Sequence, residues 1–260
     1  MNKTLELRLE RAIEVAKKAG DFALSKRKDQ DFHISEKATN DFVTSVDKET
    51  EELIYNELHG FYKSDGFYGE ESKEEFGTGR WVVDPIDGTT NYFRGQPSWA
   101  VSIAYEIEFN KPLLGVIYSP CLNEMFYALK GYGAYRNGEK IQASNIENIN
   151  YAINVCVPPH RLKEKYDTYM KIYNQIGVAS SDIRSLGSCA IELSYIACGF
   201  IDGYYELNLG YYDFAAGKII LEEAGGKFSV LNSEKELNNN RFDILATNGK
   251  LHSWFENIIL

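Results

Sequence analysis

Residues 80–91 of this chain are Arg-Trp-Val-Val-Asp-Pro-Ile-Asp-Gly-Thr-Thr-Asn, and they run from an apolar strand directly into two carboxylates. Aromatic and β-branched residues predict the strand, and Asp-Pro followed by Asp-Gly predicts a turn at its end. Pro85 fixes its own φ and donates no hydrogen bond, so this turn is rigid and leaves the Ile86 carbonyl free to face a ligand. Asp84, Asp87 and the Ile86 carbonyl therefore offer the oxygen ligands that Mg²⁺ prefers.

The residues that follow Asp87 suit a phosphate group. Gly88 lets the backbone approach a ligand closely, and Thr89 and Thr90 supply hydroxyls, with free N–H groups if a helix begins there. A plain surface turn is the alternative, because Asp, Pro and Gly are the commonest turn residues. Further acidic segments favour a metal and phosphate site: residues 40–49, which include Asp47, residues 69–72 (Gly-Glu-Glu-Ser) and residues 211–217 (Tyr-Tyr-Asp-Phe-Ala-Ala-Gly).

Over nearly its whole length the chain resembles the inositol monophosphatase family of Mg²⁺-dependent, lithium-sensitive phosphatases. Residues 84–91 resemble the central metal motif of that family, residues 69–72 its upstream metal loop, and Asp213 with Ala-Ala-Gly its C-terminal metal motif. The family usually has Trp immediately before the C-terminal aspartate, whereas Tyr212 stands there in this chain. The resemblance implies two or three Mg²⁺ ions. Its ligand set is Glu70, Asp84, the Ile86 carbonyl and Asp87 for the first ion, Asp84, Asp87 and Asp213 for the second, and Glu70 through waters for an optional third.

The resemblance also implies a catalytic mechanism. A metal-bound water, oriented by Glu70 and the Thr89 hydroxyl, attacks phosphorus in line with the departing alkoxide, without a covalent phosphoenzyme. Asp47 and Lys37 occupy the positions that the family places near the water network. Each has a structural alternative, because Asp47 could cap the helix that follows it and Lys37 could be a solvated surface lysine.

Substrate contacts are implied in the same way. Gly187, Ser188 and Cys189 resemble a segment of the family that lines the substrate pocket, although Ser188 could instead cap a helix. Glu206 matches the family position that binds sugar or inositol hydroxyls. Relatives that act on adenosine bisphosphate or histidinol phosphate usually carry Lys after the Gly-Thr of the metal motif, so Thr90 favours the inositol-phosphate-like branch; fructose bisphosphate and NADP stay open. The substrate-binding residues are Asp87, Gly88, Thr89, Gly187, Ser188, Cys189 and Glu206.

Composition is consistent with an enzyme that handles a small phosphate ester. The net charge of −10, from 28 basic and 38 acidic residues, argues against binding nucleic acid or an anionic membrane. Two carboxylates 4 Å apart repel by about 4 kcal/mol at an effective dielectric constant of 20, so an acidic cluster needs bound cations. The four cysteines and four histidines lack metal-ligand spacing, which predicts reduced, mostly buried thiols and no zinc site.

Several further expectations concern the context of the enzyme. The N-terminus lacks the apolar core of a signal peptide, and no 18-residue apolar stretch occurs, so a cytoplasmic location is expected. A homodimer is expected because members of the family are commonly dimers and 13% of the residues are aromatic. The alternative to an enzyme is a regulatory protein that binds metal but catalyses no reaction.

Hydrophobic periodicity predicts an α+β first half and an α/β second half. Together with the resemblance to the family, the expected fold is α+β, a layered αβαβα sandwich. Residues 1–145 are expected to form an antiparallel sheet with long helices, and residues 146–260 a mixed α/β half packed against it, with the active site between them. The predicted helices are 3–27 and 46–59, then 160–176, 188–199, one from Asp213 to Gly225-Gly226, and a short last one. The predicted strands are 81–83, 99–109 with one buried face, short antiparallel strands up to about 142, then 151–157, 182–186, 202–207 and two final strands.

Overall fold

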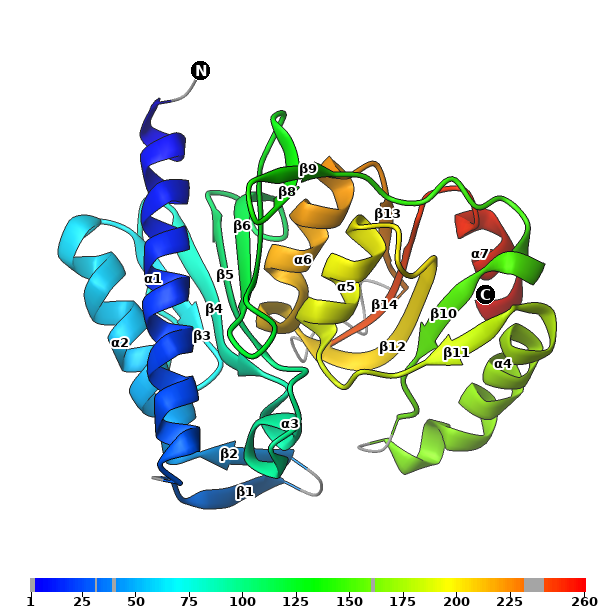
Figure 1. Cartoon of the computed structure of the whole chain (residues 1–260), viewed down its shortest axis with the longest axis horizontal. Coiled ribbons are helices and arrows are strands. Elements are labelled where there is room, and N and C mark those ends of the chain that lie inside the picture. Colours follow the sequence, from blue (N-terminus) through cyan, green and yellow to red (C-terminus); the bar gives the residue numbers. More distant parts are fainter. Residues whose placement is uncertain (1–2, 31, 39–40, 160–161, 232–240) are drawn as a thin grey trace.

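The computed structural model describes residues 3–30, 32–38, 41–159, 162–231 and 241–260, without the side chains of residues 36–38 and 41. Five layers follow one another across the molecule in the order helix, sheet, helix, sheet, helix (Figure 1). This is the layered αβαβα sandwich that the sequence predicts. Within the described residues, none of the helices combines the length and the apolar character that crossing a bilayer requires.

The first sheet has seven strands in chain order, and all neighbours are antiparallel except β3 and β4, which are parallel. Helices α1 and α2 cover its outer face and differ from the predicted bounds by two residues at most. A hairpin of β1 and β2, which the sequence analysis did not predict, joins them. These elements are α1 (Lys3–Lys28), β1 (Ile34–Ala38), β2 (Asp41–Thr44), α2 (Ser45–Phe61), β3 (Gly66–Gly69), β4 (Arg80–Asp87), β5 (Ala100–Glu106), β6 (Pro112–Ser119), β7 (Glu124–Leu129), β8 (Gly133–Arg136) and β9 (Glu139–Ile141).

The prediction that strand 99–109 buries only one face was wrong. Strand β5 is shorter and is buried along its whole length. Val101 and Ile103 pack in the cluster beneath α1 and α2, whereas Ala100 and Ala104 pack in the central cluster on the opposite face. A sheet that has helices on both faces buries both sets of alternate side chains, and alternation in the sequence alone cannot distinguish this case.

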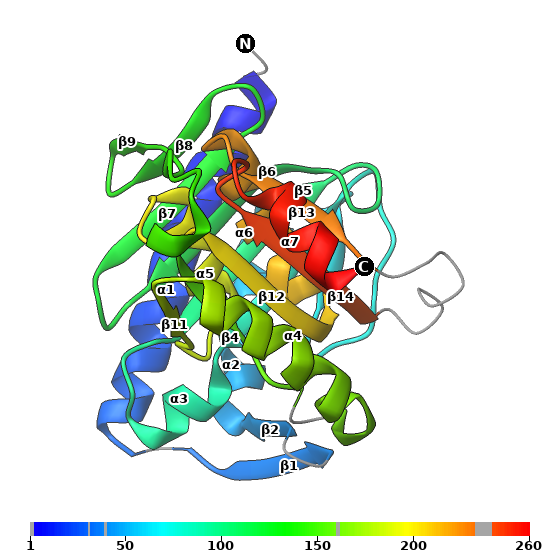
Figure 2. The ribbon, with the colours of Figure 1, turned by 90° about the vertical axis from the view of Figure 1, so that its right-hand side faces the viewer.

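The second sheet is mixed, with strand order β11-β10-β12-β14-β13, in which β10 is parallel to β11 and β12, and β14 is antiparallel to its two neighbours. Helices α5 and α6 lie between the two sheets, and α4 and α7 lie on the outer face (Figures 1 and 2). The predicted helix 160–176 begins later, at Tyr166, and residues 160–161 lie outside the described part of the chain. These elements are β10 (Ile153–Cys156), α4 (Tyr166–Ala179), β11 (Asp182–Arg184), α5 (Cys189–Ala197), β12 (Gly203–Gly210), α6 (Tyr211–Glu223), β13 (Lys227–Val230), β14 (Arg241–Thr247) and α7 (His252–Ile259).

The central helix layer ties the two sheets together. One hydrophobic cluster contains Val82 of the first sheet, Leu193 of α5, Phe214 of α6 and Tyr204 of the second sheet. The predicted boundary near residue 145 falls in the connection between the sheets, and the division into two halves there stays a prediction. All four cysteines are free, and two of them, Cys156 and Cys189, are buried.

Candidate active site

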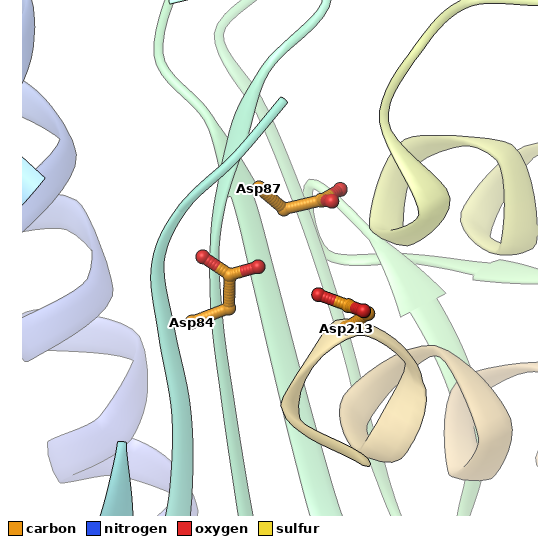
Figure 3. A group of neighbouring side chains, drawn as sticks. All are labelled: Asp84, Asp87 and Asp213. Carbon is orange, nitrogen blue, oxygen red and sulfur yellow. The ribbon is translucent and has the colours of Figure 1, made fainter. Parts of the chain in front are cut away.

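Three aspartates from distant parts of the chain meet where β4 ends and α6 begins. Asp84 and Asp87 lie at the end of β4 and Asp213 in the first turn of α6, and each offers a carboxylate oxygen within 4.8 Å of the others (Figure 3). Residues three apart on a regular strand point to opposite faces. The pairing of β4 with β5 is irregular between Asp84 and Asp87, where one extra residue is inserted on β4. This bulge, which contains Pro85, lets both carboxylates face Asp213.

The cluster is strongly acidic, with Asp84 and Asp87 buried and Asp213 partly buried. Asp84 is 1% exposed and Asp87 is 7% exposed. Burial raises the pKa of Asp84 well above its usual value, and the charges of Glu70, Asp87 and Asp213 raise it further. Burial and the charge of Asp213 raise the pKa of Asp87 to about 7, against hydrogen bonds that lower it. A divalent cation would offset this repulsion, so the donor set fits a hard metal ion with oxygen ligands.

Without metal, the free energy of unfolding should fall as the pH rises. The pKa values of Asp84 and Asp87 are higher in the folded chain than in the unfolded chain, so above pH ~4 the folded chain binds more protons. Stability is then lost progressively up to the folded pKa of Asp87, about 7. We expect the melting temperature of the metal-free protein to fall between pH 5.5 and 8, and added Mg²⁺ to raise it most at the alkaline end.

Thermal unfolding in a metal-chelating buffer over this pH range measures the effect. Asp84→Asn and Asp87→Asn are the matched variants, since each removes one of the groups with a raised pKa, and each should flatten the pH dependence. An equal fall in the wild type and in both variants would assign the pH dependence to other groups.

Asp47 caps the start of α2 and also contacts Thr89, whereas its place near the attacking water stays a prediction. Its Oδ2 accepts hydrogen bonds from the backbone N–H of Thr44 at 2.9 Å and from the Thr44 hydroxyl at 2.5 Å, which caps the start of α2. Its Oδ1 accepts from the Thr89 hydroxyl at 3.1 Å, and Thr89 Oγ1 also lies 3.1 Å from the Ile86 carbonyl. Burial raises the pKa of Asp47 to about 6. Lys37 lies in β1, and its side chain is outside the described part of the structure.

The pairing of β3 with β4 brings the upstream acidic loop to the site. Gly69 pairs with Val83, and the Glu70 N–H donates to the Val83 carbonyl at 3.2 Å, so Glu70 follows the strand beside Asp84. Glu51 of α2 holds the next residue, because its Oε2 accepts from the Glu71 N–H at 2.9 Å. Glu70 lies outside the group of three carboxylates, but it lines the same cleft.

A cleft of about 640 Å³ opens over the three aspartates, between the first sheet and the second. It has residues of β4, α3 (Thr89–Arg94), α5, β12 and α6 in its wall, and both acidic and apolar side chains face it. Most of the residues predicted for the site line it: Glu70, Asp84, Ile86, Asp87, Gly88, Thr89, Gly187, Ser188, Cys189, Glu206 and Asp213.

The loop before α5 is hydrogen-bonded to Asp87 at the end of β4 and to Asn91 in α3. Ser188 Oγ donates to Asp87 Oδ2 and accepts from the Ile191 N–H at 3.3 Å, so it both caps α5 and contacts the end of β4. Asn91 donates from Nδ2 to the Leu186 carbonyl at 2.7 Å. Gly88 has φ +90°, and a Cβ on it would lie 2.9 Å from the Gly187 carbonyl. The close approach of the two loops therefore requires glycine at position 88.

Sequence reasoning missed two charged residues that line the cleft, Glu192 and Arg241. Glu192 Oε1 accepts from the N–H groups of Leu186 and Gly187, the second at 3.2 Å. Helical spacing could have revealed it, because Glu192 lies four residues after Ser188, one turn along the predicted helix. No local signal marks Arg241.

The model of the inositol monophosphatase family matches residues 5–259 of this chain. The chain belongs to the inositol monophosphatase family. Inositol monophosphatase 2 of Solanum lycopersicum is 38% identical over an alignment of 263 positions, which covers 95% of this chain and 96% of that protein. Nus factor SuhB of Escherichia coli strain K12 is 37% identical over an alignment of 219 positions, which covers 83% of this chain and 82% of that protein.

Solved structures of relatives share the fold. The crystal structure of extragenic suppressor protein suhB from Bartonella henselae matches this chain with a TM-score of 0.91 and 32% sequence identity, covering 97% of this chain and 98% of that one. The inositol monophosphatase family generally uses Mg²⁺, and in this member Asp84, Asp87 and Asp213 could hold a metal ion.

Proposed function

We propose that this inositol monophosphatase family member is a Mg²⁺-dependent phosphomonoesterase that hydrolyses inositol monophosphate or a similar polyol phosphate. One observation carries the proposal: Asp84, Asp87 and Asp213 meet in one cleft, next to a threonine hydroxyl bonded to a buried carboxylate. The name of the plant relative, which is 38% identical, supports the choice of substrate.

Metal binding would use the residues that the sequence resemblance implies: Glu70, Asp84, the Ile86 carbonyl, Asp87 and Asp213. When bound, Mg²⁺ supplies positive charge that lowers the pKa of water from ~15.7 toward neutrality and stabilises negative charge developing on the phosphate oxygens. Two or three ions belong to the proposal. The backbone of Gly88 and Thr89, next to Asp87 in the cleft wall, would hold the phosphate group.

Thr89 would orient the attacking water. Its hydroxyl has two acceptors, Asp47 Oδ1 and the Ile86 carbonyl, each 3.1 Å away, and donation to either leaves a lone pair of Thr89 Oγ1 available to accept a hydrogen bond from water in the cleft. Asp47 is fully buried, and its pKa of about 6 keeps it mostly ionised above that pH, which fixes the direction of the hydrogen bond. Glu70 would hold the same water from the other side.

Thr89→Ala should lower the rate of phosphate release by about 10²-fold or more, because a positioned proton-transfer group typically contributes 10²–10⁴-fold. Thr89→Ser keeps the hydroxyl and should retain most of the activity. Steady-state release of phosphate from myo-inositol 1-phosphate measures the loss, and calorimetric titration with Mg²⁺ checks that metal binding is unchanged. Alanine and serine variants of equal activity would remove Thr89 from the mechanism.

Substrate selection would depend on the other wall of the cleft. Glu206 lies in β12, and the Tyr204 hydroxyl donates to its Oε2, which fixes the carboxylate. A carboxylate accepts hydrogen bonds from substrate hydroxyls, and Gly187, Ser188 and Cys189 complete this side of the cleft. A few such contacts discriminate modestly, so fructose 1,6-bisphosphate and NADP are the alternative substrates within the family.

The second candidate function is a metal-binding regulatory protein without turnover. The observation in its favour is that one relative, 37% identical, is named Nus factor SuhB. The contact between Thr89 and Asp47 favours the enzyme, since a protein that only binds metal has no need of an oriented hydroxyl.

A phosphate-release screen tests the proposal. It compares myo-inositol 1-phosphate, fructose 1,6-bisphosphate, NADP, adenosine bisphosphate and histidinol phosphate, with and without Mg²⁺ and Li⁺. We expect Mg²⁺-dependent, lithium-inhibited release with the highest kcat/KM for the inositol ester. Metal binding without release from any of the five would favour the regulatory protein. A homodimer and a cytoplasmic location belong to the proposal because the resemblance to the family supports them.

A further inference from the structure

Glu192 is a buried carboxyl group in the cleft wall that the proposed chemistry leaves without a role. It lies in the first turn of α5 and is 1% exposed. Its Oε1 accepts from the N–H groups of Leu186 and Gly187. Its Oε2 is buried and has no hydrogen-bond partner among the described residues. A buried carboxylate oxygen without a partner is unfavourable in a folded protein, so each such atom calls for an explanation.

Glu192, which carries the unpartnered Oε2, forms a pair of acid groups with Glu206. Glu192 and Glu206 line the same cleft, and after burial the charge of Glu192 is the largest cause that raises the pKa of Glu206. The charge of Asp87 contributes to raising the pKa of Glu192, so the pair lies toward the aspartate cluster. Two consecutive elements, α5 and β12, thus present two acid groups to a ligand held at Asp87.

We propose that Glu192 is a second hydroxyl-binding residue of the substrate site, which acts with Glu206 to bind two neighbouring hydroxyl groups of a polyol phosphate. This inference rests on the proposed phosphatase function. A substrate hydroxyl would supply the donor that Glu192 Oε2 lacks, and the phosphate of the same substrate would lie at the aspartate cluster. Glu192 would then select for the polyol part of the substrate, whereas the metal ligands select for the phosphate.

The protonation of the pair is consistent with this role. Burial raises the pKa of Glu192 to about 8, and the pKa of Glu206 is also well above its usual value. A carboxyl group that retains its proton both donates and accepts hydrogen bonds, as a hydroxyl does. Two acid groups of which one is protonated can bind neighbouring hydroxyls without the repulsion between two full charges.

The alternative is that Glu192 only fastens the loop before α5. Two substitutions separate the two roles. Glu192→Gln keeps an oxygen to accept from Leu186 and Gly187 but replaces Oε2 by an amide group that only donates. Glu192→Ala removes both the loop contact and the free oxygen. A loop defect disturbs Asp87 through its hydrogen bond from Ser188, and every phosphate ester depends on Asp87 as a metal ligand, whereas a lost hydroxyl contact affects polyol esters alone.

The experiment measures kcat/KM at saturating Mg²⁺ for myo-inositol 1-phosphate and for 4-nitrophenyl phosphate, which has no hydroxyl groups. We expect Glu192→Ala to lower the ratio of the two values by about 10-fold or more, and Glu192→Gln to lower it by about 3- to 10-fold while 4-nitrophenyl phosphate changes less than about twofold. Glu206→Gln is the reference variant and should lower the ratio in the same way. Melting temperatures check the folding of each variant, and Glu192→Gln suffices if the alanine variant is unfolded.

Binding of free myo-inositol, at millimolar concentration, is a readout that needs no turnover. It should raise the melting temperature of the wild type and raise that of Glu192→Gln less. Equal losses for both substrates in Glu192→Ala, with full recovery in Glu192→Gln and an unchanged response to myo-inositol, would overturn the inference. If the wild type hydrolyses neither ester, the proposed function fails, and a myo-inositol response that Glu192→Gln abolishes would still support the binding role.

Discussion

Asp84→Asn should reduce phosphate release from myo-inositol 1-phosphate by about 10³-fold or more. Asp84 is almost completely buried in the acidic cluster, and the ligand set implied for both of the first two ions includes it. Metal ions supply several kcal/mol of transition-state stabilisation, and each 1.36 kcal/mol corresponds to a tenfold change in rate. A neutral amide in place of the carboxylate removes charge at the point where the cluster attracts Mg²⁺.

Two measurements accompany this prediction. Without metal, Asp84→Asn should melt at a higher temperature than the wild type at neutral pH, because it removes a buried acid whose pKa is raised. Asp182→Asn is the matched control, since Asp182 lies in β11, pairs with Arg184 at the surface and is about half exposed. It should retain full activity. An Asp84→Asn protein that folds and releases phosphate at a rate within tenfold of the wild type would refute the proposed metal site.

Removal of divalent metal should reduce phosphate release to the background rate, and added Mg²⁺ should restore it. Hydrolysis of phosphate monoesters is among the slowest uncatalysed reactions, with accelerations of up to about 10²¹-fold, whereas one acid or base contributes only 10²–10⁴-fold. Asp47 and Thr89 alone therefore cannot supply the rate. The acidic cluster also repels a phosphate ester when no cation occupies it.

Phosphate release is followed during chelation and readdition, with circular dichroism to confirm that the chelated protein stays folded. Glu70→Gln extends the test, because we expect a loss of several orders of magnitude in the presence of Mg²⁺. A chelated enzyme that stays folded and keeps about a tenth of its activity would show that the chemistry depends on side chains rather than on metal.

Much of the fold could be predicted because the periodic elements are long. Helices α1 and α2 carry apolar residues at helical spacing over several turns, and the structure confirms both. The prediction was less accurate for short elements whose formation depends on an adjacent strand or helix. The parallel partner β3 and the hairpin of β1 and β2 are short strands that form only when the adjacent backbone is in place. The helix predicted from residue 160 begins at Tyr166.

The same distinction holds for the site. Residues 84–91 and 69–72 were recognised because their chemistry is local: carboxylates, a proline turn and a glycine within a few residues. Glu192 was missed because what sets it apart is its hydrogen bond from the Gly187 N–H and the effect of its charge on the pKa of Glu206, which no short motif records. Ser188 was left with two alternatives: the structure shows the helix cap, in which its hydroxyl accepts from Ile191 and donates to Asp87, and the substrate contact stays a prediction.

The sequence by itself determined the chemistry of the parts: a rigid acidic turn at a strand end, further carboxylates in two other segments, and an acidic chain of 260 residues with enough apolar residues for a layered fold. Only the tertiary structure decided how the parts meet. A bulge in β4 turns Asp84 and Asp87 to one face, and the packing of α6 between two sheets brings Asp213 to them. The reason is physical, because the backbone sets local conformation within a few residues, whereas the distance between carboxylates on different elements depends on the packing of the whole core.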